Sequence, residues 1–269
     1  MSFLKINPSK DFCQEFLTIA EQLLNNYILR INGYSYYIAE IEFYLNSDKH
    51  PDIFSHSTDD QLTCSQWCFH KTGESYRGGN YKGLDISFGK KSYGGILIRA
   101  IKSCHKDAYI EGPCNVVNHI LTLSEVENIP ELITSEHFHR NIFKKGLIYL
   151  KPTKRMNLTI YSSARIGLNL RNKHQVPYVI QPYRFLTCPS YVRKGRQHLV
   201  LELYYQGYKL KQIQKIVNYT QCLKWIQYYD IGFEGDTTAK KYFNKKMNVN
   251  EFSEFYGAMK RINNQDCLY

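Results

Sequence analysis

Two glutamates and a tyrosine alternate with apolar residues in the segment 37–45, a spacing that could support hydrolytic chemistry. As a strand, the segment has two faces, one with Tyr37, Ala39, Ile41, Phe43 and Leu45, the other with Glu40, Glu42 and Tyr44. Carboxylates two residues apart lie roughly 6 to 7 Å from each other, and bare charges are costly to bury unless another group pairs with them or uses them. The segment is therefore either part of an active site or an edge strand with solvated glutamates.

An arginine interrupts a second strand-like segment. Residues 95–101 are nearly all apolar except for Arg99, which indicates a central strand with an unusual occupant. We expect Arg99 to have an anionic partner, with Glu42, Glu40 and Asp85 as the candidates.

Composition narrows the class of protein. The 269 residues include 35 basic and 24 acidic side chains, a net charge of +11 that favours a polyanionic partner. No apolar run approaches the roughly 20 residues that span a bilayer, and no hydrophobic stretch follows a basic start, so we expect neither a membrane nor a secreted protein. The eight cysteines have no regular spacing, which fits a reducing compartment, cytoplasmic (nucleoid) or nuclear.

One group of cysteines and histidines could in principle bind zinc. Cys64, Cys68 and His70 lie close in sequence, and Cys104, His105, Cys114 and His119 follow. The spacing matches no recognised zinc motif. We therefore expect no metal and no cofactor.

The pattern of elements predicts an α+β fold, with a curved, mostly antiparallel sheet and flanking helices in residues 1–192 and a small all-α module in residues 193–269. Helices are expected at 12–24 and 116–123, and a loop at 46–70. Asn32-Gly33 predicts a tight hairpin turn. The expected strands are 27–31, 34–45, 83–88, 95–101, 147–150, 158–162 and 183–187.

The last 77 residues resemble a helix-turn-helix module. They hold 13 basic and 7 acidic residues, and three short helices are expected at 197–205, 210–217 and 220–229, the third capped by Thr220. In that arrangement the side chains that would face a DNA major groove are Gln221, Lys224, Gln227 and Tyr228. The alternative is a packing appendage on the first domain.

Seven short motifs occur in the order found in the alkyladenine (methylpurine) DNA glycosylases, which residues 27–192 therefore resemble. Each is weak alone, and their common order carries the resemblance. They are Ile38 to Tyr44, Ser55-His56-Ser57, Gly83 to Ser87, Ile96 to Ala100, Gly112-Pro113, Ala164-Arg165-Ile166-Gly167 and Pro182 to Phe185.

The resemblance implies a monofunctional DNA glycosylase that flips a base out of double-stranded DNA and hydrolyses its glycosidic bond without a cofactor. Glu42 falls on the general base and Arg99 on the arginine that helps to hold the attacking water. Tyr44 and His56 match pocket residues, and Val192 matches a position whose carbonyl binds the water. Arg165 lies in a motif expected to contact DNA.

The chain also departs from that family. The hairpin that plugs the vacated duplex is shorter here, with Tyr76 as the candidate plug. Asp85 replaces a selectivity asparagine, which favours a base that presents hydrogen-bond donors. The resemblance therefore does not fix the excised base.

Two other functions stay open. The protein could be a DNA-binding regulator that uses the glycosylase fold as a scaffold, or a defence glycosylase acting on bulky modified bases of foreign DNA. In each case we expect a monomer.

Overall fold

The chain divides into two compact units. The computed structural model describes residues 3–7, 9–236 and 238–266, with side chains of the last helix up to residue 262. The first unit comprises Met1–Ile160 and Phe185–Thr187, and the second Tyr161–Arg184 and Cys188–Tyr269. Packing thus separates the chain after Ile160, whereas the sequence suggested a division of function after Val192. That functional division stays a prediction.

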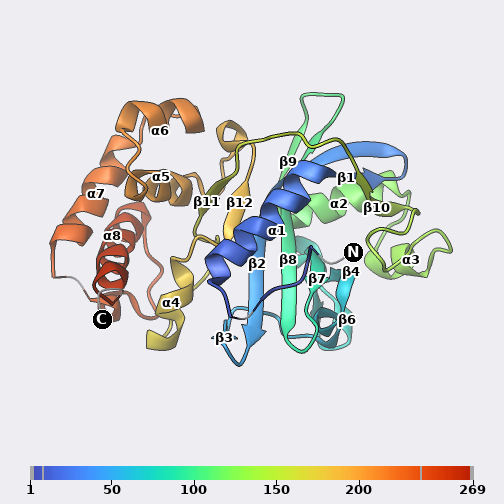
Figure 1. The fold of residues 1–269 in the computed structure, drawn as a ribbon, viewed down its shortest axis with the longest axis horizontal. Helices are drawn as coiled ribbons and strands as arrows, with labels where there is room; N and C mark the ends of the chain where they lie inside the picture. The colour runs from blue at the N-terminus through green and yellow to red at the C-terminus, as the bar shows by residue number, and fades with distance from the viewer. Residues whose placement is uncertain (1–2, 8, 237, 267–269) are drawn as a thin grey trace. The chain divides into compact units, whose positions relative to one another are not determined.

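An antiparallel sheet forms the centre of the first unit (Figure 1). Its main path runs in the order β10-β1-β2-β8-β7-β4. Its strands are β1 (Tyr27–Ile31), β2 (Tyr34–Ser47), β3 (His50–Pro51), β4 (Cys64–Phe69), β7 (Leu84–Phe88), β8 (Tyr93–Ser103), β9 (Tyr109–Glu111) and β10 (Ile148–Pro152). The mixture of this sheet with helices confirms the expected α+β class.

Helix α1 (Phe12–Asn26) covers one face of the sheet (Figure 1). Asp11 caps it by accepting bonds from the backbone N–H groups of Cys13 and Gln14. Its buried residues recur at helical spacing, and the Phe16 ring stacks on Phe43 of β2 at 4.7 Å between centroids. The hairpin that follows turns at Asn32 and Gly33, whose φ angles are 39° and 86°, as the sequence predicts.

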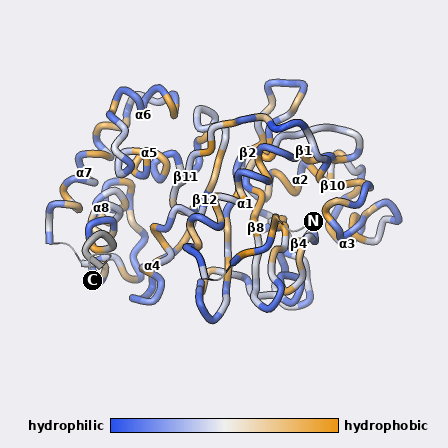
Figure 2. Tube along the Cα trace, in the orientation of Figure 1, coloured by the Kyte–Doolittle hydropathy of each residue, from blue (hydrophilic) through white to orange (hydrophobic). Residues whose placement is uncertain are grey.

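Strand β2 is central and its middle is buried on both faces. Figure 2 shows that the neighbouring strand β8 also carries a hydrophobic stretch. Glu40 and Glu42 are 1% and 0% exposed, which rules out an edge strand with solvated glutamates. From Glu40 to Leu45 the two faces of the strand alternate as expected. The expectation is wrong at Tyr37, which is half-buried, because the register of β2 and β8 shifts between Ile38 and Ile41.

Residues 46–70 are not a continuous loop. They contain β3, the 3₁₀ turn η1 (Asp59–Leu62) and β4, which pairs with β7. Strand β4 starts with polar residues, and only Trp67, Cys68 and Phe69 are buried. Its sequence therefore lacks the alternation of apolar and polar residues that indicates a strand. After it come the small hairpin β5 (Lys71–Thr72) and β6 (Ser75–Tyr76) and the turn η2 (Gly79–Tyr81).

Two helices complete the first unit. Helix α2 (Pro113–Leu123) packs against β8 and β9 and begins three residues before the predicted start, at the proline that follows Gly112. Gly112 has a φ of 104°, which only glycine adopts readily. Helix α3 (Ile129–Thr134) is short and is capped by the side chain of Asn128.

The second unit is mainly helical. Its elements are β11 (Tyr161–Ser163), η3 (Lys173–Gln175), α4 (Val176–Val179), β12 (Arg184–Leu186, of which Arg184 belongs here), η4 (Pro189–Tyr191), α5 (Arg196–Tyr205), α6 (Leu210–Val217), α7 (Leu223–Glu234), η5 (Ala239–Tyr242) and α8 (Val249–Asp266). The three predicted helices of residues 193–269 are thus present as α5, α6 and α7, and α8 was not predicted. The expected cap Thr220 is wrong, because α7 begins after Cys222.

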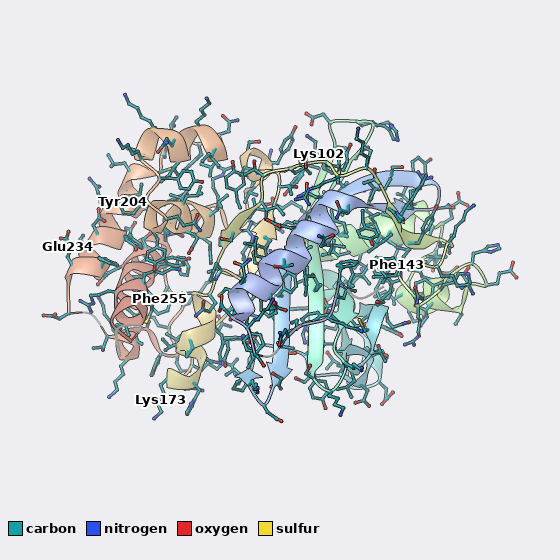
Figure 3. All side chains as sticks on the ribbon, viewed as in Figure 1. Lys102, Phe143, Lys173, Tyr204, Glu234 and Phe255 are labelled. Atoms are coloured by element: carbon teal, nitrogen blue, oxygen red, sulfur yellow. The ribbon has the colours of Figure 1, made fainter. Side chains whose placement is uncertain are left out.

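Helices α7 and α8 pack with their backbones in close contact. A Cβ atom on Gly232 would lie 1.8 Å from the carbonyl oxygen of Glu254, and one on Gly257 would lie 2.0 Å from that of Tyr229. Figure 3 labels Glu234 at the end of α7 and Phe255 on α8. Glycine is therefore required on both helices.

Across the described ranges, no helix combines the length and the apolar character needed to cross a bilayer.

Candidate active site

Three buried charged side chains meet between strands β2 and β8. Arg99 donates from Nε to Glu40 Oε1 at 2.8 Å and from a terminal guanidinium nitrogen to Glu42 Oε2 at 3.3 Å. The hydroxyl of Tyr44 donates to the same Glu42 oxygen at 2.8 Å. This geometry confirms that Arg99 has an anionic partner. It has two, Glu40 and Glu42.

Electrostatics keep this cluster charged. Burial by itself lowers the pKa of Arg99, but the carboxylates of Glu42 and Glu40 outweigh that effect and raise the pKa above its usual value. One cation thus faces two carboxylate groups.

An irregularity in strand pairing places Arg99 between the glutamates. Glu40 is opposite Ala100 and Ile41 is opposite Ile98, so Arg99 is the extra residue on β8. Ala39 is the extra residue on β2, and its carbonyl accepts a bond from Thr187 N at 3.0 Å. Bulges of this kind re-aim side chains and often occur beside active sites.

Asp85 shares a sheet face with Glu42. In the paired strands Glu42 is opposite Leu97, and Leu97 is opposite Asp85, so the three form one row across β2, β8 and β7. Two strand spacings put the Cα atoms of Glu42 and Asp85 roughly 10 Å apart. Gly95 lies beside this row, where a Cβ atom would be 2.6 Å from Asp85 Oδ2. The carboxylate thus occupies space that only a glycine leaves open.

Two further side chains fix Asp85. His70 Nε2 lies 2.8 Å from Asp85 Oδ1, and Gln61 Nε2 donates to Oδ2 at 3.2 Å. The ring of His56 packs edge-on against His70 with centroids 4.3 Å apart. The sequence interpretation missed His70 and Gln61 as site residues, although the Cys68-x-His70 spacing had drawn attention to His70 for another reason.

The residues of the first unit that are expected around a flipped base form two groups. Glu42, Arg99 and Tyr44 form one group, and Asp85 and His56 are joined to each other through His70. Tyr44 and His56 keep exposed surface, whereas Glu42 has none.

Comparison with known proteins shows a relative in a virus. No protein-family profile matches the chain. An uncharacterized protein, L759, of Acanthamoeba polyphaga mimivirus is 34% identical over 201 residues, which cover 68% of this chain and 91% of the viral protein. The chain belongs to the family of this mimivirus protein. The printed name of the mimivirus relative assigns no activity.

Three other predicted site residues, Tyr76, Val192 and Arg165, lie in different surroundings in this member of the mimivirus-protein family. Tyr76 is half-buried, and Lys71 Nζ lies 5.1 Å from the centre of its ring. Val192 is buried, and its carbonyl accepts a bond from Arg196 Nε at 2.7 Å. Arg165 is only 1% exposed and donates to the Tyr178 carbonyl at 3.4 Å, so it is an internal group of the second unit and not a surface cation.

The cysteines and histidines do not gather as a zinc site. Within the parts of the chain that the structure describes, no group of three or more His, Cys, Asp and Glu residues is arranged to hold a metal ion. Burial, and then the charge of Asp85, raises the pKa of the Cys68 thiol to about 12. The thiol donates to the Asp60 carbonyl at 3.4 Å, and His70 binds Asp85 instead.

His56 gives a prediction for the dependence of stability on pH. Desolvation, followed by the charge of His70, lowers the pKa of His56 from 6.5 to about 4. Between these pH values the unfolded chain binds a proton on this imidazole and the folded chain does not, so stability is lost as pH falls through this window. The His56 side chain keeps exposed surface, so solvent screening reduces the effect. In urea titrations at pH 7 and pH 5, we expect the wild type to lose slightly more unfolding free energy than His56→Gln. The exposed His105→Gln is the control and should behave like the wild type; the same loss in His56→Gln would contradict the assignment.

Proposed function

We propose that the protein is a monofunctional DNA glycosylase whose catalytic centre is the Glu42, Arg99 and Tyr44 group. The observation that carries the proposal is the placement of Glu42. A carboxylate with no exposed surface is bound by both an arginine and a tyrosine hydroxyl, on the sheet face that also carries Asp85. The order of motifs shared with the alkyladenine DNA glycosylases supports the same reaction.

The proposed reaction needs only water and the base-modified strand. Glu42 accepts a proton from a water molecule as its oxygen bonds to C1′ of the nucleotide. The N-glycosidic bond breaks, its electron pair leaves with the base, and the base takes up a proton. The product is an abasic sugar with a hydroxyl at C1′. Arg99 orients Glu42, and a carboxylate next to the sugar favours the cationic character that develops on it.

Asp85 is the proposed selector of the base. His70 and Gln61 hold it as a hydrogen-bond acceptor, and neither oxygen of an ionised carboxylate can donate. A flipped base with an amino group or a protonated ring nitrogen would satisfy this acceptor. A base that presents only a carbonyl there would leave two acceptors facing each other.

The function is tested with short duplexes that each carry one altered base. The panel contains alkylated adenines and guanines, deaminated purines and bases with bulky additions, and the unmodified duplex is the control. Under single-turnover conditions we expect release of at least one free base, seen by chromatography, together with an alkali-labile site in the strand. Binding without release from any member of the panel would reject the glycosylase and favour the regulator.

The regulator is kept as a second candidate because of one observation. Helix α7 and the turn before it expose an open face with Gln221, Lys224 and Gln227. This face is separate from the Glu42 group in the sequence and in the division into units. A regulator needs that face and no chemistry. Base release distinguishes the two functions.

The aromatic side chain that would fill the gap left by a flipped base is better assigned to Tyr81 than to Tyr76. Tyr81 is 77% exposed in the turn η2 and lies four residues before Asp85, whereas Tyr76 contacts Lys71 and Phe69. Stacking of a base on an aromatic ring contributes about 1–3 kcal/mol. We expect Tyr81→Ala to lower single-turnover excision at limiting protein by roughly tenfold. Tyr76→Ala is the matched control, and a larger loss in that variant would restore the first assignment.

A further inference from the structure

We propose that the exposed face of helix α7 reads the major groove of double-stranded DNA. This inference concerns the second unit and does not depend on the proposed glycosylase activity. It rests on the packing of three helices, the turn between two of them, the composition of one helix face and the distribution of charge.

Helices α5, α6 and α7 form a small three-helix core. Ile213 and Val217 of α6, Cys222 and Ile226 are buried, and α5 contacts both other helices. In a helix-turn-helix, the helix after the turn packs on the preceding helices and exposes its outer face. Helix α7 has this position after α5 and α6.

The turn from α6 to α7 is held by specific contacts. Asn218 ends α6 in the left-handed conformation, with φ 47° and ψ 51°. Gln214 Nε2 then donates to the Thr220 carbonyl at 2.6 Å, and the Tyr219 ring stacks on Trp225 at 5.4 Å. Arg196 of α5 lies 4.6 Å from the centre of the Tyr219 ring. The start of α7 is therefore fixed to both preceding helices.

The outer face of α7 is polar at its start and acidic near its end. Lys224 and Gln227 are exposed in the first half, and Gln221 is exposed in the turn just before the helix. These three line an open hollow with Tyr228, while Ile226, Tyr229 and Gly232 are buried on the opposite side. Glu234 lies at the end of the helix (Figure 3). In a helix-turn-helix, the N-terminal residues of the second helix contact base edges, which is where the uncharged and basic side chains lie here.

Charge favours DNA as the occupant of this face. Lys209, Lys211 and Lys215 are exposed on α6 or at its start, and residues 209–217 include no acidic side chain. The first helix of such a pair crosses the phosphate backbone. Glutamine fits the adenine edge and lysine the guanine edge in the major groove, so Gln227 and Lys224 suit a purine-containing site.

The exposed Leu223 and Ile231, 50% and 57% accessible, are the features of α7 that a protein partner would use instead. They lie on the same outer face as Lys224 and Gln227, and Leu223 could also contact a thymine methyl group. Ile231 is two turns beyond Lys224, next to acidic Asp230. The positive charge of α6 therefore favours DNA over a protein as the partner of this face.

The test uses the full chain and unmodified duplex DNA, so a failure of base excision does not affect it. A truncation after Val192 would cut through the second compact unit, and point substitutions are used for this reason. Lys211→Ala/Lys215→Ala removes two proposed phosphate contacts. Lys240→Ala/Lys246→Ala removes two exposed lysines elsewhere in the same unit, with the same change in net charge.

Binding of a 30-base-pair duplex is measured by fluorescence anisotropy over a range of salt concentrations. We expect the first pair to lower the slope of log K against log salt by about 2, and the control pair to leave it nearly unchanged. Selection from a random duplex pool should yield a short motif for the wild type. In the Gln227→Ala protein, discrimination at one base pair of that motif should fall roughly tenfold. Equal slope losses in the two pairs, or a motif that Gln227→Ala leaves intact, would overturn the proposal.

Discussion

Glu42→Gln is expected to lower single-turnover base release by roughly 100-fold or more, the usual scale for a lost general base. Glutamine keeps the shape of the side chain and can still contact Arg99 and Tyr44, but it cannot take a proton from water. DNA binding should change little. The measurement is the rate of base release at saturating protein, with binding followed separately by anisotropy.

Glu40→Gln is the matched control for this change. Glu40 is equally buried and binds the same arginine, at 2.8 Å, but Tyr44 donates to Glu42. If Glu42 is the base, the two variants should lose similar amounts of unfolding free energy in urea, while Glu40→Gln keeps excision within about tenfold of the wild type. Equal losses of excision in the two variants would mean that the cluster only supports the fold.

Arg99→Met should have the largest effect on stability. It removes the arginine that contacts both buried carboxylates, and removal of one partner from a buried ion pair costs about 3–5 kcal/mol. Urea denaturation measures this cost. Arg99→Lys keeps the charge but lacks the planar fork that reaches both glutamates, so we expect an intermediate loss.

A combined variant separates the stability of this cluster from its chemistry. Glu40→Leu/Glu42→Leu/Arg99→Met replaces all three charged groups by apolar side chains, and such replacements are often neutral or stabilising. We expect it to recover much of the stability that Arg99→Met loses, yet to release no base. A stable Arg99→Met protein with full excision would show that Arg99 is needed neither for the stability of the fold nor for base release.

The local patterns of the sequence predicted the sheet strands that carry Glu42 and Arg99, and the three helices α5, α6 and α7. They did not predict the row formed by Glu42, Leu97 and Asp85, because strand register depends on pairings between distant segments. The bulges at Ala39 on β2 and Arg99 on β8 offset each other in register, and no local period of two reveals them.

The missed elements have other physical causes. The sequence predicts a loop where strand β4 lies, because this strand gains its burial from β7 and not from its own composition. His70 was considered with the cysteines, and only the folded chain brings it to Asp85. Thr220 has the chemistry of a helix cap, but the bond from Gln214 to its carbonyl keeps residues 219–222 in the turn.

Because of the glycine contacts between them, α7 and α8 move together as one rigid unit. With Gly232 against the Glu254 carbonyl and Gly257 against that of Tyr229, neither helix can slide or rotate past the other without a backbone collision. Any tilt of α7 toward a bound partner therefore carries α8 with it. The amide protons of both helices should accordingly exchange with solvent in one concerted opening event.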